Sequence, residues 1–210
     1  KEYRRQRQMC IRDRCLQSVN EGGAGCATCH SGDFFTDEKF HVLALPQIGP
    51  GKEDGRFNDD YGRFRVSGNS IDLYAFRTPT LYNVEFTGPY GHDGAYVNLK
   101  GIIKHHLNPS QAVELYDVTQ VNSALKTQFL AINTKKALSK LEENRKALKH
   151  AIQGIRLNNQ QVNDLTSFLF TLTDSCVKSV ACLDPWMPNN EETDPDGLRL
   201  KARMLSSIAR

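Results

Sequence analysis

The sequence predicts a mainly α-helical fold with long irregular loops and little strand, and three observations support this. Apolar residues recur at helical spacing from Val97 onward. Glycine, aspartate, proline and asparagine dominate residues 31–75, where periodicity is weak. Two cysteines and a histidine follow a glycine-rich stretch, GGAGCATCH, just before that loop. A chain of 210 residues has room for one domain with a core plus extensions.

The first fifteen residues carry the basic charge of the chain. They hold six basic and two acidic residues, a local charge of +4; the whole chain carries +3, so the remainder carries −1. The basic isoelectric point therefore reflects a solvated segment and is no argument for nucleic-acid binding. Because the opening has neither an initiator methionine nor a secretory h-region, we expect a fragment or a processed chain. Residues 1–15 are expected to be disordered or non-native, with a short helix near 12–20.

The next part of the chain lacks helix signals. An irregular loop over 31–75 is unusually long for a compact domain. Its length is explained if it encloses a large apolar cofactor that supplies part of the core. Residues 75–94 are expected to be extended and turn-rich, because Pro79 and Pro89 exclude a helix.

Three helices are predicted after this region. The first begins near Val97 and ends at Asn108-Pro109; the second covers about 138–155; the third is capped by Asn158 or Asn159. Their apolar faces comprise Leu99, Ile102, Ile103 and His106; Leu138, Leu141, Leu148, Ile152 and Ile155; and Val162, Leu165, Phe168, Leu169 and Leu172. The tail after Asp174 is rich in turn residues, and no apolar run is long enough to span a membrane.

The motif Cys26-Ala27-Thr28-Cys29-His30 is typical of covalent haem attachment. Two thiols one turn apart can meet the two vinyl groups of a porphyrin, and the adjoining imidazole of His30 reaches the iron from the same face. A structural zinc site is a weaker alternative, because it needs a second ligand pair, and Cys176 and Cys182 have no histidine beside them. A thioredoxin-like redox pair is weaker still, because an apolar strand does not precede the motif.

The sequence offers several candidates for the second axial ligand of the iron. The three methionines, Met9, Met187 and Met204, all lie outside the region expected to fold over a haem. His106 lies on the apolar face of its helix and is the first candidate. His105 is the alternative, and water or an open site is a third option. A satisfied core histidine is the structural alternative for His106.

Three segments resemble the C-terminal half of bacterial dihaem cytochrome c peroxidases and their MauG-type relatives. They are CATCH, FRTPTLYNV (76–84) and TGPYGHDGAYVNLKGIIKHH (87–106). The likeness runs from about residue 22 to 173 and closes with LNNQQVNDLTSFLFTLTD. It implies a cytochrome c-like domain with long irregular loops around a covalent haem over 16–174, followed by a turn-rich extension over 175–210.

The resemblance also implies roles for individual residues. The family's axial partner falls at His106, where relatives place Met or Tyr; histidine there favours a low reduction potential. Arg77 corresponds to an arginine near the haem propionates, with a surface arginine as the alternative. The backbone carbonyls of Thr87 and Pro89 correspond to calcium ligands between two haem domains. His92 corresponds to a histidine near the domain interface.

The family's compartment is the periplasm, which permits disulfides, so Cys176 and Cys182 are expected to form a bridge. Expected partners are a second haem domain, a small electron donor such as a cytochrome c or a cupredoxin, and a second copy of the chain; nucleic acid and a membrane span are not expected. Three functions remain open at this stage. The chain is the electron-transfer part of a dihaem peroxidase or MauG-type oxidase, a monohaem electron carrier, or a non-redox remnant.

Overall fold

The fold was analysed in a computed structural model that describes residues 23–122, 126, 128–147 and 154–186. Segment 1–15, the helix near 12–20 and the tail beyond Trp186 lie outside the described residues, as do Cys10, Cys15, His150 and the three methionines. The α-helices are α2 (Phe64–Ser67), α3 (Leu99–Leu107), α4 (Pro109–Glu114), α5 (Leu130–Ala147), α6 (Asn159–Phe170) and α7 (Val180–Leu183). The strands are β1 (Phe40–Val42) and β2 (Ala75–Arg77). Short 3-10 turns are η2 (Cys26–Thr28), η3 (Ser70–Asp72), η4 (Val84–Phe86), η5 (Val118–Gln120), η7 (Ser175–Lys178) and η8 (Asp184–Trp186).

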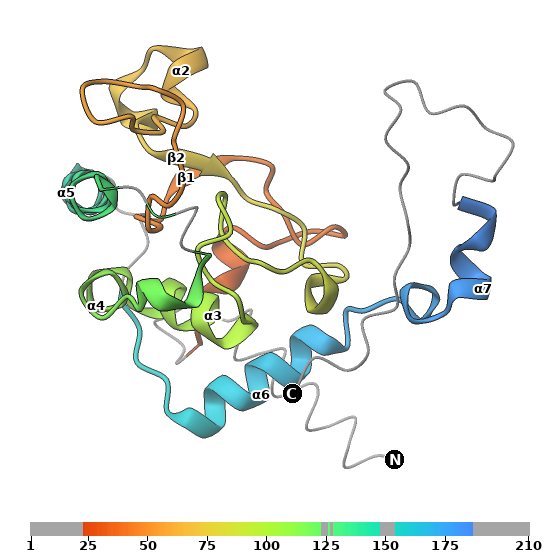
Figure 1. The fold of residues 1–210 in the computed structure, drawn as a ribbon. Helices are drawn as coiled ribbons and strands as arrows, with labels where there is room; N and C mark the ends of the chain where they lie inside the picture. Colours follow the sequence, from red (N-terminus) through yellow and green to blue (C-terminus); the bar gives the residue numbers. More distant parts are fainter. Residues whose placement is uncertain (1–22, 123–125, 127, 148–153, 187–210) are drawn as a thin grey trace, which may run out of the picture.

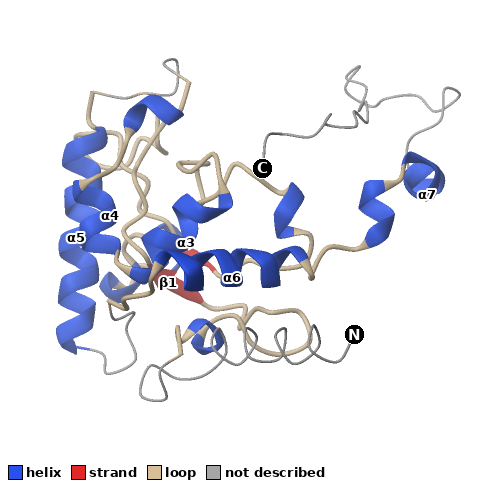
Figure 2. Cartoon of the chain, turned by 90° about the horizontal axis from the view of Figure 1, so that it is seen from below, coloured by secondary structure: helices blue, strands red, loops and turns tan. Residues whose placement is uncertain are grey.

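Helices and loops make up most of the described chain, which confirms the prediction of a mainly α fold with little strand (Figure 2). The strands β1 and β2 pair antiparallel, with His41 opposite Phe76. The larger apolar core gathers around α3 and α6, and a smaller one joins β1 and β2 to α5. The long loops lie around these two cores (Figure 1).

The boundary between α3 and α4 follows from local chemistry. Asn98 caps α3 by accepting a hydrogen bond from the backbone N–H of Gly101. The helix ends at Leu107, before Asn108-Pro109, as predicted. Asn108 then caps α4, whose first residue is Pro109, a position where proline costs no hydrogen bond.

Helix α6 begins with a complete capping box. The Asn158 side chain accepts from the backbone N–H of Gln161, and the Gln161 side chain accepts from the backbone N–H of Asn158. This identifies Asn158, rather than Asn159, as the cap. The apolar face that the sequence predicted is buried at Val162, Leu165, Phe168 and Leu169.

The helix predicted over 138–155 differs from the observed one at both ends. Helix α5 begins at Leu130, its described part ends at Ala147, and residues 154–157 are not helical. Ile155 instead donates its backbone N–H to the carbonyl of Leu107 at 2.6 Å. Gly154 disfavours a helix, and the end of α3 needs donors for its free carbonyls. The 154–157 segment therefore joins α3 rather than extending α5.

Helix α5 turns polar side chains toward the interior. Asn133 donates to the carbonyl of Phe57 at 2.8 Å, and Thr134 accepts from the backbone N–H of Gln47 at 3.0 Å. Both helix residues are buried. These contacts satisfy backbone groups of the long loop, which explains how so irregular a segment is held in place.

Beyond α6 the chain forms η7, α7 and η8, which extend away from the rest of the described chain (Figures 1 and 2). The sequence predicted a turn-rich tail here, and its described part is a series of single helical turns. None of the helices in the described ranges combines the length and apolar character that crossing a bilayer requires.

Candidate functional site

A cavity of about 710 Å³ lies within the larger core. This size falls within the range of cofactor sites in proteins. Its walls come from the turn over residues 24–30, the segment 76–92, α3 and α6. Apolar side chains such as Leu81, Ile102 and Phe168 make up most of the lining.

Cys26, Cys29 and His30 share one tight turn on the wall of this cavity. Gly25 has a left-handed conformation, with φ 63°, and starts the turn η2. The backbone N–H of His30 donates to the carbonyl of Cys26 at 2.8 Å. This local geometry places both sulfurs and the imidazole at the same wall of the cavity.

Both motif thiols are free and hold their protons. Burial raises the pKa of Cys26 and that of Cys29 to about 11. The Sγ of Cys29 lies close to a hydrogen-bonded pair formed by His41 Nε2 and Asp37 Oδ2 at 2.8 Å, and these three groups come within 4.8 Å of one another. Three groups are one fewer than a structural zinc site uses, and Cys26 is not among them. From the sequence alone His41 has no assigned role, although its spacing of four residues from Asp37 is a weak signal for such a pair.

The orientation of His30 is fixed by its own loop. Its Nδ1–H donates to the carbonyl of Phe35 at 3.0 Å. In a neutral imidazole this leaves the lone pair on Nε2. Burial lowers the pKa of His30, which favours the neutral form.

His106 lines the cavity from α3 and faces His30. Its Nδ1–H donates to the carbonyl of Ile102 at 2.8 Å, so its lone pair is also on Nε2. Burial lowers the pKa of His106 to about 4, which keeps the ring neutral. The two ring centroids are 6.3 Å apart, with the planes tilted by 50°. A metal–imidazole bond is about 2 Å long, so this separation suits one metal ion between the rings.

His105 is the neighbour of His106, but it does not line the cavity. It is fully buried, and its ring nitrogens bond to the Leu43 carbonyl at 2.7 Å and the Tyr96 hydroxyl at 2.8 Å. Both nitrogens are therefore in use. The structure brings His30 and His106 together and leaves His105, the other axial candidate, in the core.

With this geometry in view, we compared the chain with other proteins. No protein-family model matches it. It is 29% identical over 167 residues to the methylamine utilization protein MauG of Methylophilus methylotrophus. It is 34% identical over 100 residues to the cytochrome c551 peroxidase of Nitrosomonas europaea. These similarities place the relatives of this chain among MauG proteins and cytochrome c peroxidases.

The likeness to this family is partial in length. The matched segments cover 79% of this chain and 36% of the Methylophilus protein, and 48% of this chain and 25% of the Nitrosomonas protein. The fold also resembles the crystal structure of a MauG-like protein associated with microbial copper homeostasis, with a TM-score of 0.54 and 24% identity. That alignment covers 86% of this chain and 51% of the other.

Similarity to MauG and cytochrome c peroxidases implies haem c as the cofactor. The residues present fit such a group. The cavity has an apolar lining, two free thiols on one turn, and two neutral imidazoles with Nε2 lone pairs. These are the donors that covalent attachment and axial ligation of haem iron require.

The remaining residues that the family resemblance singled out also border the cavity. Arg77 lies at its wall, with more than half of its side chain exposed, and forms an ion pair with Glu38 at 3.3 Å. Thr87 and Pro89 line the cavity beside η4. His92 stacks on Phe76, with ring centroids 3.5 Å apart.

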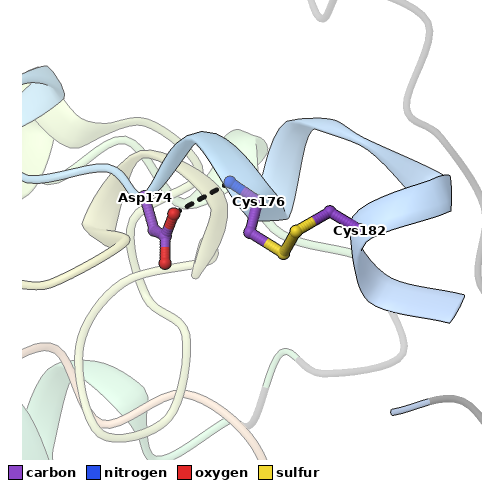
Figure 3. Close-up of a disulfide and its surroundings, with 3 residues drawn as sticks. All are labelled: Asp174, Cys176 and Cys182. Carbon is purple, nitrogen blue, oxygen red and sulfur yellow. Dashed lines mark hydrogen bonds between the residues drawn. A yellow bond between two sulfur atoms is a disulfide. The ribbon is translucent and has the colours of Figure 1, made fainter. Parts of the chain in front are cut away.

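A disulfide joins Cys176 and Cys182 outside the cavity (Figure 3). Its Cα atoms are 5.2 Å apart, and the Asp174 side chain accepts from the backbone N–H of Cys176 at 2.8 Å. The same segment is attached to η4, because Lys178 pairs with Glu85 at 3.0 Å. Glu85 is the neighbour of Val84, a cavity residue.

Proposed function

We propose that this chain is a c-type haem domain that transfers electrons. In this proposal Cys26 and Cys29 form thioether bonds to the haem, and His30 and His106 are the axial ligands of its iron. The observation that carries the proposal is the placement of the two imidazoles across one apolar cavity, 6.3 Å apart, with both free thiols on its wall.

The bound haem would supply a one-electron couple of its iron. The chain's residues hold, orient and shield that group. Phe35 and Ile102 each accept from an axial-candidate imidazole, which fixes the tautomer with Nε2 available. Apolar side chains of α3 and α6, such as Ile102 and Phe168, would pack against the haem. A histidine pair without a methionine favours a potential below that of Met/His cytochromes c.

Within the family, we assign the chain to the C-terminal, electron-transfer half of a dihaem peroxidase or MauG-type oxidoreductase. The FRTP and PYGHDG segments, which include Arg77 and His92, support this assignment. The domain comprises residues 16–174. On this proposal Arg77 contacts a haem propionate, the carbonyls of Thr87 and Pro89 contribute to a calcium site, and the chain works in the periplasm beside a second haem domain.

A monohaem electron carrier is the second candidate. It needs only the one Cys-x-x-Cys-His motif that the 210 residues contain, because a single haem can relay electrons. The two candidates share the haem, its ligands and the electron-donor protein. They differ in whether peroxide is reduced when a second haem domain is joined to this chain.

The proposed haem ligation is tested by expressing the chain in a host that attaches haem to exported proteins. We expect one haem per chain by the pyridine haemochrome assay, and an increase in polypeptide mass that survives denaturation. The reduced-minus-oxidised spectrum should be low-spin. The control is the double variant Cys26→Ser, Cys29→Ser, which should lose the covalent mass. A colourless wild-type chain with the mass of the bare polypeptide would refute the proposal.

A further inference from the structure

Both ring nitrogens of His105 are hydrogen-bonded. The Leu43 carbonyl accepts only, so Nε2 carries the proton and donates to it at 2.7 Å. The bare Nδ1 then accepts from the Tyr96 hydroxyl at 2.8 Å. A neutral imidazole has one donor and one acceptor, and both are satisfied here in a fully buried side chain.

These two partners belong to different walls of the cavity. Leu43 directly follows β1 and lines the cavity. Tyr96 pairs with Tyr90, another lining residue, through two backbone hydrogen bonds of 2.7 and 3.0 Å. The Tyr96 ring also packs edge-on against Tyr116. His105 therefore connects α3 with the end of β1 and with the turn over residues 90–96.

His106 is held differently. Within the described part of the chain, its hydrogen bond goes to Ile102, one turn earlier in the same helix. Because donor and acceptor belong to the same helix, this bond does not fix how the helix is rotated about its own axis. Neighbouring positions on an α-helix differ in direction by about 100°. A contact that fixes the direction of His105 therefore also fixes the direction of His106.

We propose that His105 is a positioning residue, which holds α3 against Leu43 and Tyr96 so that His106 points into the cavity toward His30. This inference rests on the proposed function, because it takes His106 as the second axial ligand. It assigns His105 no contact with the haem. It predicts that losing either hydrogen bond of His105 weakens the bond between His106 and the iron while the domain remains folded.

The test uses carbon monoxide, which binds ferrous haem iron only where an axial ligand has left. The variants are His105→Leu, which removes both hydrogen bonds, and Tyr96→Phe, which removes one hydroxyl. Loss of one partner of a buried polar group should raise the apparent carbon monoxide affinity about tenfold, because the form without the His106 bond becomes more populated. The electronic spectrum should gain a high-spin component in parallel.

Two further variants serve as controls. His105→Gln retains an N–H group for the Leu43 carbonyl, so its carbon monoxide affinity should lie closer to wild type than that of His105→Leu. Lys104→Gln changes an exposed residue of the same helix and should match wild type. Circular dichroism and haem content verify that each variant is folded and loaded. If His105→Leu does not fold, Tyr96→Phe and His105→Gln decide the question.

The two proposals fail in distinguishable ways. If the wild-type spectrum is unchanged by His106→Ala, then His106 is not a ligand, and the proposed ligation itself is wrong. If wild type is low-spin through His106 but the folded His105→Leu and Tyr96→Phe variants bind carbon monoxide as wild type does, the positioning role of His105 is refuted. The ligation by His106 would then stand.

Discussion

Two adjacent histidines of α3 show how strongly the surroundings decide a residue's chemistry. His105 bonds through both ring nitrogens to Leu43 and Tyr96 and is fully buried in protein. His106 lines the cavity and bonds through Nδ1 to its own helix, which leaves the lone pair on Nε2. The same side chain thus connects parts of the core at one position and offers a lone pair to a metal ion at the next.

At the proposed haem, His106→Met should raise the reduction potential, because a thioether stabilises the reduced iron more than an imidazole does. We expect a rise on the order of 0.1 V, well within the range that axial ligands cover. Potentiometric titration of the haem-loaded chain measures it, and Lys104→Gln is the control on the same helix. An unchanged potential in a folded variant would argue against His106 as a ligand.

Asp93 gives a pH-dependent prediction. Burial raises its pKa to about 7 from 3.8; its Oδ2 accepts from the backbone N–H of Ile48 at 2.9 Å, while Oδ1 has no partner among the described residues. Between about pH 4 and 7 the folded chain holds this proton and the unfolded chain does not, so this carboxyl's contribution to stability falls as pH rises.

Asp93→Asn removes that dependence and retains an acceptor for Ile48. The free energy of unfolding of the variant minus that of wild type should be larger at pH 8 than at pH 5, by on the order of 2 kcal/mol. Urea unfolding of the haem-loaded proteins at both pH values measures the difference. Comparing the variant with wild type at the same pH cancels the titration of histidines remote from Asp93. His92 Nε2 lies 3.8 Å from Asp93 Oδ2, but burial lowers the pKa of His92 to about 4, so the ring is neutral at both pH values. The prediction would be contradicted if the variant and wild type differed in free energy of unfolding by the same amount at pH 5 and at pH 8.

At the scale of elements, short polar signals define where helices begin and end. Asn108 ends α3 and caps α4, and Asn158 and Gln161 form the capping box of α6. These signals lie within a few residues of each helix end, so the helix ends can be predicted from the sequence. The end of α5 is not local, because residues 154–157 bond to Leu107 at the end of another helix.

The capping box of α6 yields a matched pair of variants. Asn158→Ala removes the acceptor for the backbone N–H of Gln161 and should lower the free energy of unfolding by about 1 kcal/mol. Asn159→Ala changes the same residue type one position later, where it does not form the cap, and should change stability little. Thermal unfolding of the two variants side by side provides the measurement. Equal losses in both would show that the cap is not responsible.

At the scale of the whole molecule, buried polar contacts hold the long loop against α5. Asp59 is fully buried and pairs with Lys136 at 2.6 Å, and the Lys136 ammonium also lies 4.5 Å from the centre of the Phe57 ring. The buried Asn133 adds a hydrogen bond to the same loop. The smaller core therefore depends on charge and hydrogen bonds as well as on apolar packing.

Lys136→Met should destabilise the chain strongly, because it leaves the carboxylate of Asp59 buried without its counter-charge. We expect a loss on the order of 3 kcal/mol in the free energy of unfolding. Lys135→Met, on the exposed side of the same helix, is the control and should be close to neutral. Denaturant unfolding compares the two. A Lys136→Met variant as stable as the control would mean that the pair contributes little.

Features that depend on neighbouring residues could be predicted from the sequence. These are the Cys26–His30 motif, the end of α3 at Asn108-Pro109 and the apolar face of α6, because spacing and capping act within a few residues. The helical pattern favoured His106 and left His105 open. Which of the two histidines lines the cavity could not be predicted, because it depends on contacts of His105 with Leu43, 62 residues away along the chain. The polar inner face of α5 could not be predicted for the same reason. The backbone carbonyl to which Asn133 donates belongs to a loop that is distant in the sequence.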